Sequence, residues 1–351
     1  MQNQDTNSSF EPRSAVLARV VRGETVESVH RGHFIVIDGD GGTVAEGGEP
    51  RSITYFRSAC KPLQAIPMIA SGAADAFEFS DVEIALSCAS HSGEARHVRA
   101  AMQMLAKTGL TEPFLRCGAH LPFYEKEAER MIRERELPTQ FHNNCSGKHA
   151  GMLAFAKHIG ADLAAYEEIG HPVQRAILET IAEFTSVPMD EIAVGVDGCA
   201  APNFAVPIDA MATAFMRLIS PPTGFETPVV DACRRVVSAM LQYPELVGGS
   251  ERLDTLLMQA APGKFISKVG AEGVWLCGVL PSERWPKGLA IALKVEDGDD
   301  KRGRPVAAVA ILRQLGILSG DALPDISPMP IKNRRGDDVG RVEPGVTILT
   351  D

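Results

Sequence analysis

The chain has 351 residues, of which 45% are hydrophobic and 23% are charged, so it can bury one large core or two ordinary ones. The formal net charge is −10, and Lys and Arg are scattered singly, which argues against nucleic acid or an anionic membrane surface as a partner. Seven widely spaced cysteines do not suit a disulfide framework, and they predict reduced thiols in the cytoplasm. The apolar runs are too short to span a bilayer, so we expect a soluble protein with a small-molecule partner.

The first part of the chain changes from strand patterns to helix patterns. Residues 1–14 are polar and predict a flexible tail. Residues 15–46 predict strands that form a hairpin around an Asp-Gly-rich turn. Helical patterns interrupted by Gly, Pro and Asn then dominate up to residue 260. The predicted helices cover residues 61–71, 94–107, 123–136, 148–160, 171–185, 207–219, 228–242 and 251–260.

The last part of the chain returns to strands. The patterns predict strands within 264–280 and 288–298, a helix at 303–317 and a short strand-like tail near 338–350. Strands at both ends therefore bracket a helical middle, which predicts an α/β (α+β) fold whose antiparallel sheet is assembled from the two chain ends. No clear interdomain linker is visible, so we expect residues 15–351 to form a single catalytic unit, with the helical middle at about 94–260 inserted between the sheet-forming ends.

A serine and a lysine lie three residues apart in "FRSACKP", residues 56–62. This spacing arises by chance in most chains of this length, so an ordinary helix start is the simpler interpretation. On a helix, residues i and i+3 face the same way, so a neutral Lys61 amine can accept the proton of the Ser58 hydroxyl. Pro62 has no N–H to donate to residue 58, so we expect Ser58 at the helix mouth, in a first turn tightened to 3₁₀ geometry.

Four further stretches place reactive side chains where apolar runs end. They are "SCASHSGEARH" (87–97), "NNCSGKHAG" (143–151), "GVDGCAAP" (195–202) and "ISKVGAEG" (266–273). Ser90 can equally serve as a helix cap. Cys145, at a helix start, is a plausible thiolate, although for Cys145 and Cys199 a buried and inert role is the more common one. Lys268 interrupts an apolar strand, where desolvation lowers a lysine pKa.

Seven segments, in the same order along nearly the whole chain, resemble those of one enzyme family. They are "HRGH" (30–33), "RSACKP" (57–62), "CASHSGEARH" (88–97), "RCGAH" (116–120), "NNCSGKHAGML" (143–153), "DGCAAP" (197–202) and "SKVGAEG" (267–273). The family is that of the Rhizobium etli-type L-asparaginases, the asparaginase II family. The resemblance implies a fold similar to serine β-lactamases and glutaminases, and hydrolysis of L-asparagine to aspartate and ammonia by a homodimer.

The resemblance also implies roles for ten residues. The catalytic residues would be two Ser–Lys pairs, Ser58 with Lys61 and Ser90 with Lys268. Zinc would be held by Cys145, Lys148 and Cys199. The substrate pocket would include Arg57, His149 and Asp197.

The chemistry places demands on these groups. Lys61 must be neutral to accept a proton, so we expect burial and the second cation, Lys268, to disfavour its charged form. Ser90 would relay a proton from Lys268 to the leaving nitrogen, although which serine is the nucleophile stays open. Asp197 and Arg57 can pair with the α-amino group and the α-carboxylate of asparagine, respectively.

Three other functions remain as alternatives. A penicillin-recognising acylase also uses Ser-x-x-Lys, but neither a clear Ser-x-Asn nor a Lys-Thr-Gly segment is present. A glutaminase-like enzyme is harder to distinguish from an asparaginase. Glutamine has one methylene more than asparagine, and one methylene changes the binding free energy by only about 1–3 kcal/mol. A non-catalytic amino-acid-binding or zinc-binding protein would keep the pocket without turnover.

Overall fold

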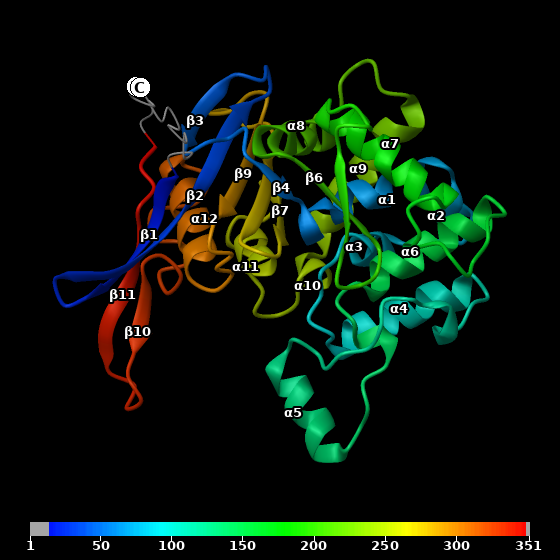
Figure 1. The fold of residues 1–351 in the computed structure, drawn as a ribbon, viewed down its shortest axis with the longest axis horizontal. Helices are drawn as coiled ribbons and strands as arrows, with labels where there is room; N and C mark the ends of the chain where they lie inside the picture. Colours follow the sequence, from blue (N-terminus) through cyan, green and yellow to red (C-terminus); the bar gives the residue numbers. More distant parts are fainter. Residues whose placement is uncertain (1–13, 349–351) are drawn as a thin grey trace, which may run out of the picture.

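The computed structural model describes residues 14–348, which form a mixed α/β architecture (Figure 1). The larger of its two sheets is antiparallel and has eight strands. These strands are β1 (Ala15–Arg22), β2 (Thr25–Asp38), β3 (Thr43–Gly47), β7 (Phe265–Gly270), β8 (Val274–Val279), β9 (Leu289–Val295), β10 (Met329–Lys332) and β11 (Asp338–Pro344). Except for Ser14, the tail predicted over residues 1–14 lies outside the described residues.

Strands from the two ends of the chain are neighbours in the larger sheet. The strand order is β10-β11-β1-β2-β9-β8-β7, with β3 paired to β2. The β2–β9 pair runs from Gly32 opposite Val295 to Asp38 opposite Leu289. In Figure 1 the blue strands of the amino end lie beside the orange strands of the carboxyl end. The prediction that both chain ends build one antiparallel sheet is therefore confirmed.

The part of the sheet formed by β7 and β8 is enclosed. Every residue of these two strands is buried, which is typical of strands covered on both faces. The helices α8 (Ile208–Ile219) and α12 (Gly303–Gln314) both pack against β8 and β9. Because Lys268 lies within β7, the sheet holds a lysine in the protein interior.

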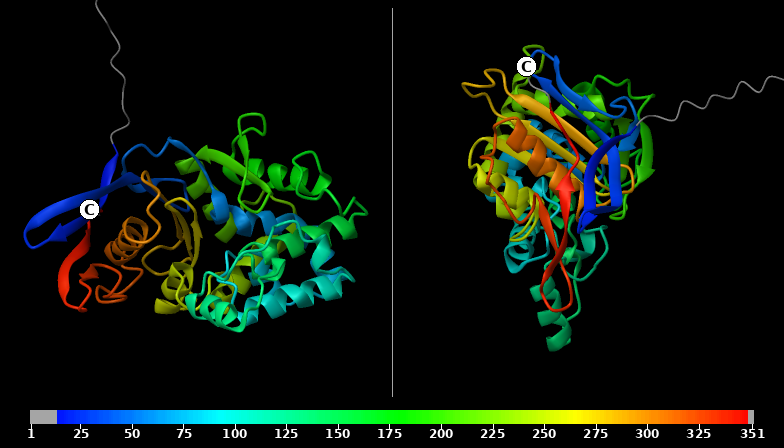
Figure 2. Two further views of the ribbon diagram at one scale, coloured as in Figure 1. Left: turned by 60° about the horizontal axis from the view of Figure 1, so that its bottom comes forward. Right: turned by 90° about the vertical axis from the view of Figure 1, so that its left-hand side faces the viewer.

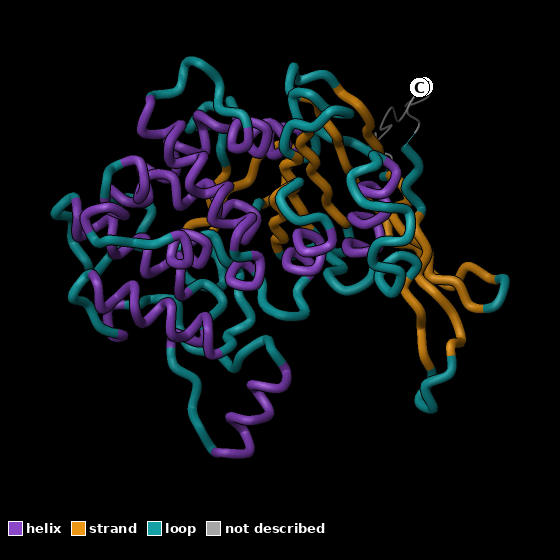
Figure 3. Tube along the Cα trace, turned by 180° about the vertical axis from the view of Figure 1, so that it is seen from behind, coloured by secondary structure: helices purple, strands orange, loops and turns teal. Residues whose placement is uncertain are grey.

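A helical part lies beside the β7 edge of the sheet (Figures 2 and 3). Besides α8 and α12, the helices are α1 (Lys61–Ala70), α2 (Ala73–Ala76), α3 (Asp81–Ser87), α4 (Ala95–Lys107), α5 (Glu125–Glu134), α6 (Ser146–His158), α7 (Pro172–Thr185), α9 (Thr227–Gln242), α10 (Pro244–Val247) and α11 (Leu253–Ala260). All the predicted helices are confirmed to within a few residues at each end. None of the helices within residues 14–348 is long and apolar enough to cross a membrane.

Two helices of this part differ sharply in burial. Residues 146–156 of α6 are all buried, as expected for a helix packed on every side. In contrast, α5 projects from the molecule (Figure 1), and Met131 is its one buried residue. The segments that carry the cysteine motif are therefore central, whereas the α5 arm is peripheral.

The structure contains a small second sheet that the sequence patterns do not predict. Its order is β4 (Ile53–Tyr55), β6 (Pro202–Pro207) and β5 (Ala193–Val196). The strands β4 and β5 have only three and four residues, too few for a clear alternation of apolar and polar side chains. This sheet brings Arg57, which lies just after β4, close to Asp197, which follows β5.

Candidate active site

Ser58 lies in a tight turn directly before a buried helix. The 3₁₀ helix η1 (Arg57–Cys60) runs into α1, and the Lys61 N–H donates to the Ser58 carbonyl. The tightened first turn expected from Pro62 is therefore confirmed, with the proline in the first turn of α1. The turn presents Ser58 to a cavity, while α1 carries Lys61 into the interior.

Lys61 is buried and donates to two backbone carbonyls. Its Nζ lies 2.7 Å from the Ala89 oxygen and 3.2 Å from the Asn144 oxygen. A neutral amine has two N–H bonds and one lone pair, so these carbonyls use both of its hydrogens and leave the lone pair free. Within residues 14–348 no carboxylate forms a salt bridge with Lys61. These surroundings suit a lysine that acts as a base.

Ser90 reaches the same cavity from the segment between α3 and α4. The Asn144 side-chain amide donates to Ser90 Oγ at 2.9 Å. The carbonyl of the preceding residue, Ala89, accepts from Lys61, so Lys61 is close to the backbone beside Ser90. The capping alternative for Ser90 is wrong, because the N-cap of α4 is Glu94.

Lys268 pairs with a buried acid that the sequence motifs did not single out. Its Nζ lies 3.3 Å from Asp254 Oδ2 and donates to the Val269 carbonyl at 2.9 Å. Burial lowers the pKa of Lys268 to about 8, with Asp254 opposing this change and Lys61 adding to it. Within the described residues Lys268 makes no hydrogen bond to Ser90. Their predicted pairing is therefore not a direct contact in this structure.

Asp254 is held by further hydrogen bonds. The Ser267 hydroxyl donates to Oδ1 at 2.8 Å, and the Val269 N–H donates to Oδ2 at 3.0 Å. The Trp275 indole N–H in turn donates to the Ser267 hydroxyl at 2.9 Å. An acidic residue at the start of the apolar helix pattern "LDTLL" was the one sequence signal for Asp254, and it looks like an ordinary first-turn acid.

The two predicted zinc-ligand cysteines and the predicted lysine ligand do come together. Cys145 precedes α6, whose first turn carries Lys148, and Cys199 follows β5. Lys148 Nζ lies 3.0 Å from Cys199 Sγ. Among the described residues, no three His, Cys, Asp or Glu side chains gather as a metal site. The candidate zinc set therefore depends on Lys148 as its third donor.

The two cysteines of this cluster have opposite pKa shifts. The pKa of Cys199 lies far below its usual range. The largest cause is a hydrogen bond from the Cys145 thiol, and Lys148 and His149 add to it, so that together they outweigh the opposite effect of burial. Burial alone would lower the pKa of Lys148, but the sulfurs of Cys199 and Cys145 raise it. The pKa of Cys145 is raised by its contact with Cys199 and by burial. The Cys199 thiol is therefore the more acidic of the two, whereas the pKa of Cys145, a plausible thiolate from its place at a helix start, is raised.

His149 lies behind the two cysteines and is fully buried. Its Nδ1 is 2.7 Å from the Tyr166 hydroxyl, and its Nε2 has no hydrogen-bond partner among residues 14–348. Because His149 is beside Cys199 and does not line the cavity, its position supports the cysteine cluster rather than direct contact with a substrate.

Arg57 and Asp197, the other two predicted substrate-binding residues, pair with each other. Arg57 Nε donates to Asp197 Oδ1 at 2.9 Å, and the Gly198 N–H donates to the same oxygen at 2.8 Å. Arg57 has a φ of +50°, in the left-handed region that is uncommon for side chains other than glycine. Such strain is typical of functional sites.

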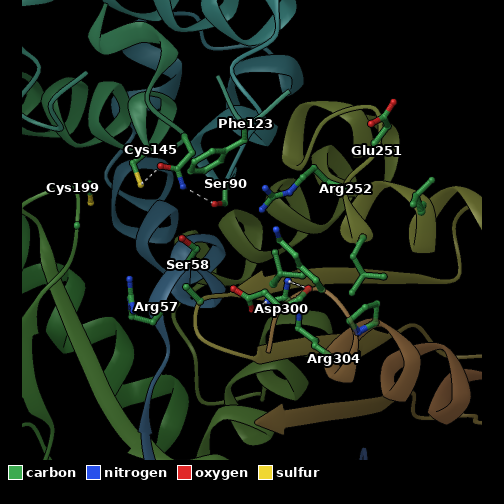
Figure 4. A pocket seen from close by; sticks show the side chains of 18 of the residues that line it. Arg57, Ser58, Ser90, Phe123, Cys145, Cys199, Glu251, Arg252, Asp300 and Arg304 are labelled. Carbon is green, nitrogen blue, oxygen red and sulfur yellow. Dashed lines mark hydrogen bonds and ion pairs between the residues drawn. The ribbon is translucent and has the colours of Figure 1, made fainter. Parts of the chain in front are cut away.

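A cavity of about 770 Å³ joins these groups between the helical part and the sheet (Figure 4). Six of the ten predicted site residues line it: Arg57, Ser58, Ser90, Cys145, Asp197 and Cys199. The other four, Lys61, Lys148, His149 and Lys268, are buried outside its lining. The lining also contains polar, charged or aromatic residues that the sequence reasoning missed, including His120, Phe123, Arg252, Asp300 and Arg304.

Comparisons with known proteins identify a family and several similar structures. A family model described as L-asparaginase II matches residues 18–344. A probable glutaminase from Bacillus subtilis, complexed with 6-diazo-5-oxo-L-norleucine, is similar at 13% identity and a TM-score of 0.41, over 82% of this chain and 85% of that chain. A β-lactamase from Burkholderia ambifaria is similar at 14% identity and a TM-score of 0.40, over 82% of this chain and 94% of that chain. No curated protein matches. Because the family model spans most of the chain, the protein belongs to the L-asparaginase II family and is an amidohydrolase.

Proposed function

We propose that this amidohydrolase is an L-asparaginase, which hydrolyses L-asparagine to L-aspartate and ammonia by Ser–Lys chemistry. The observation that carries the proposal is the position of Lys61. It follows Ser58 by one turn, and its Nζ donates to the carbonyls of Ala89 and Asn144, next to Ser90. One buried amine thus lies close to both serine segments, and both serines point into the cavity (Figure 4).

In the proposed reaction Ser58 Oγ attacks the amide carbon, and its proton passes to Lys61 Nζ. The C–N bond then breaks as the nitrogen takes a proton from the Lys268 ammonium and ammonia leaves. Ser90 relays this proton once the Lys268 side chain has moved within hydrogen-bond distance of the Ser90 hydroxyl. A water molecule attacks the Ser58 ester and gives one proton to neutral Lys268. Lys61 returns its proton to Ser58 Oγ, which completes the cycle and releases the acid product.

The different partners of the two lysines support this division of roles. Asp254 stabilises the cation of Lys268, whereas Lys61 has carbonyl acceptors only. A lysine that donates a proton needs its charged form, and a lysine that accepts one needs its neutral form. The pKa of Lys268, lowered by burial to about 8, keeps it charged at neutral pH yet able to release its proton.

Release of ammonia from asparagine, glutamine and a β-lactam tests the proposed activity. We expect asparagine to be the best substrate, and Ser58→Ala to lower kcat by about a thousandfold or more. Faster hydrolysis of glutamine would identify a glutaminase, and amino-acid binding without ammonia release would identify a non-catalytic protein. A trapped acyl group found by mass spectrometry on Ser90, with Ser58 unmodified, would exchange the roles of the serines.

Zinc held by Cys145, Lys148 and Cys199 is the second part of the proposal. The donors fit, because two sulfurs and an amine converge, as zinc prefers, and three protein ligands leave a fourth position open. Lys148 must lose its proton to act as a ligand. Bound zinc would supply a positive charge that orients the substrate or polarises its carbonyl oxygen.

Metal analysis of protein purified without added zinc tests this part. We expect about one zinc ion per chain, lost in Cys199→Ser and kept in Cys233→Ser, which changes a buried cysteine of α9. Removal of zinc with a chelator should lower the melting temperature of the parent, because the ion links α6 to the loop after β5. Full activity with almost no zinc would make the site incidental. The homodimer and the cytoplasmic location stay predictions from the sequence.

A further inference from the structure

The cavity contains an arginine that no acid offsets. Arg57 pairs with Asp197 at 2.9 Å, and the buried Arg304 pairs with Asp300. Arg252 also lines the cavity, but within residues 14–348 its side chain forms neither a salt bridge nor a hydrogen bond. A half-buried guanidinium with free donors is suited to an anionic ligand.

Two further cations, Lys268 and Arg304, lie near Arg252 and add to the positive potential on this side of the cavity. Burial lowers the pKa of Lys268 and of Arg304, and the nearby charge of Arg252 lowers both further. Two of these three cations have acid partners, Asp254 and Asp300, which leaves the charge of Arg252 without one. An anion that enters this side of the cavity would therefore be attracted to Arg252.

Arg252 is also held in a defined position. It is the N-cap residue of α11, and its N–H donates to the Gly249 carbonyl at 3.2 Å. Its guanidinium carbon lies 5.7 Å from the centre of the Phe123 ring. In Figure 4 the guanidinium points toward Ser90. The charge is therefore directed at the space next to the catalytic serines.

We propose that Arg252 binds the α-carboxylate of the substrate and so selects amino-acid amides over other amides. The inference rests on the proposed function, and it assigns to Arg252 a role that the sequence alone favours for Arg57. A guanidinium can donate two parallel hydrogen bonds to a carboxylate, a geometry that an ammonium does not offer. Arg57 is less suited, because Asp197 already offsets its charge. Lys301 lines the cavity too, but it is exposed.

Binding measurements with two truncated ligands isolate this contact. Succinamate is asparagine without its α-amino group, and 3-aminopropanamide is asparagine without its α-carboxylate. Calorimetric titrations in a Ser58→Ala background avoid turnover. We expect Arg252→Gln to weaken asparagine and succinamate about 10- to 100-fold and to leave 3-aminopropanamide within about twofold. Arg252→Lys should recover part of the loss, and the control Lys301→Met should change little.

The pattern across ligands decides the outcome. Equal losses of affinity for both truncated ligands would show a structural role for Arg252 and overturn the inference. Unchanged binding of succinamate by Arg252→Gln would also overturn it, and so would a parent protein that does not bind succinamate. In the enzyme with Ser58, Arg252→Gln should raise KM more than it lowers kcat. If the parent enzyme released no ammonia from asparagine while the ligand pattern held, the proposed function would fail and the carboxylate site would stand.

Discussion

At the scale of single residues, the two buried lysines differ in their hydrogen-bond partners. Lys61 donates to carbonyls, and Lys268 has a carboxylate partner, yet both side chains are almost completely buried. A positive charge on Lys61 lowers the pKa of Lys268, so protonation of both at once is disfavoured. Asp254 pairs with Lys268, so in the proposed mechanism this acid selects Lys268 to carry the resting proton.

Replacement of Asp254 by Asn tests this selection. Asp254 opposes the lowering of the Lys268 pKa by burial, so its removal should take that pKa below about 8. If the Lys268 cation donates a proton, the basic limb of the pH–rate profile should move to lower pH, because Lys268 then loses its proton earlier. The amide of Asn can still accept from the Ser267 hydroxyl, which limits structural damage.

The opposite result would reassign the lysine. A gain of activity at low pH, with the acidic limb moved and the basic limb unchanged, would show that Lys268 acts as a base. Ser267→Ala provides the matched control, since it removes a neighbour of Asp254 but leaves the Lys268–Asp254 salt bridge. We expect its pH–rate profile to keep both limbs close to those of the parent.

At the scale of elements, the site depends on close approaches between segments that are far apart in sequence. A Cβ atom on Gly270 would lie 2.4 Å from the Phe56 carbonyl oxygen, so only glycine lets β7 pass this close to η1. The segment before α11 is tied to the start of α4, because Glu94 accepts from the Ser250 N–H at 2.7 Å. These contacts bring β7, which carries Lys268, close to the turn that carries Ser58, and they hold the segment of Arg252 against the segment that follows Ser90.

The sequence predicts much of the fold but only part of the site. Strand and helix periodicity is strong in long elements, so the sheet built from both chain ends and the main helices are confirmed. Ser58 stands out because it lies three residues before Lys61 at the start of an apolar stretch, and Ser90 because it follows the end of one. Asp254 and Arg252 do not, since an arginine and an aspartate at the start of a helix are typical of any soluble helix. Their importance comes from contacts across the chain, which local patterns do not contain.

At the scale of the whole molecule, an ion pair lies inside the core. Lys268 and Asp254 form an ion pair in which the side chains are 0% and 1% exposed. The desolvation of such a pair can exceed its attraction, and replacement by uncharged groups is often neutral or stabilising. We therefore expect this pair, whose proposed role is catalytic, to cost folding free energy.

Urea unfolding of the double variant Lys268→Met, Asp254→Asn measures this cost. The pKa of Lys268 is about 8 in the folded chain and about 10.5 when unfolded, so between these values the unfolded chain binds more protons and the stability of the parent rises with pH. We expect the inactive double variant to be at least as stable as the parent at pH 7, and its advantage to shrink by on the order of 3 kcal/mol between pH 8 and 10.5. An advantage that stays constant over this range would show that folding does not lower the pKa of Lys268. Lys268→Met alone should be less stable than the double variant, because it leaves the Asp254 carboxylate buried without its partner.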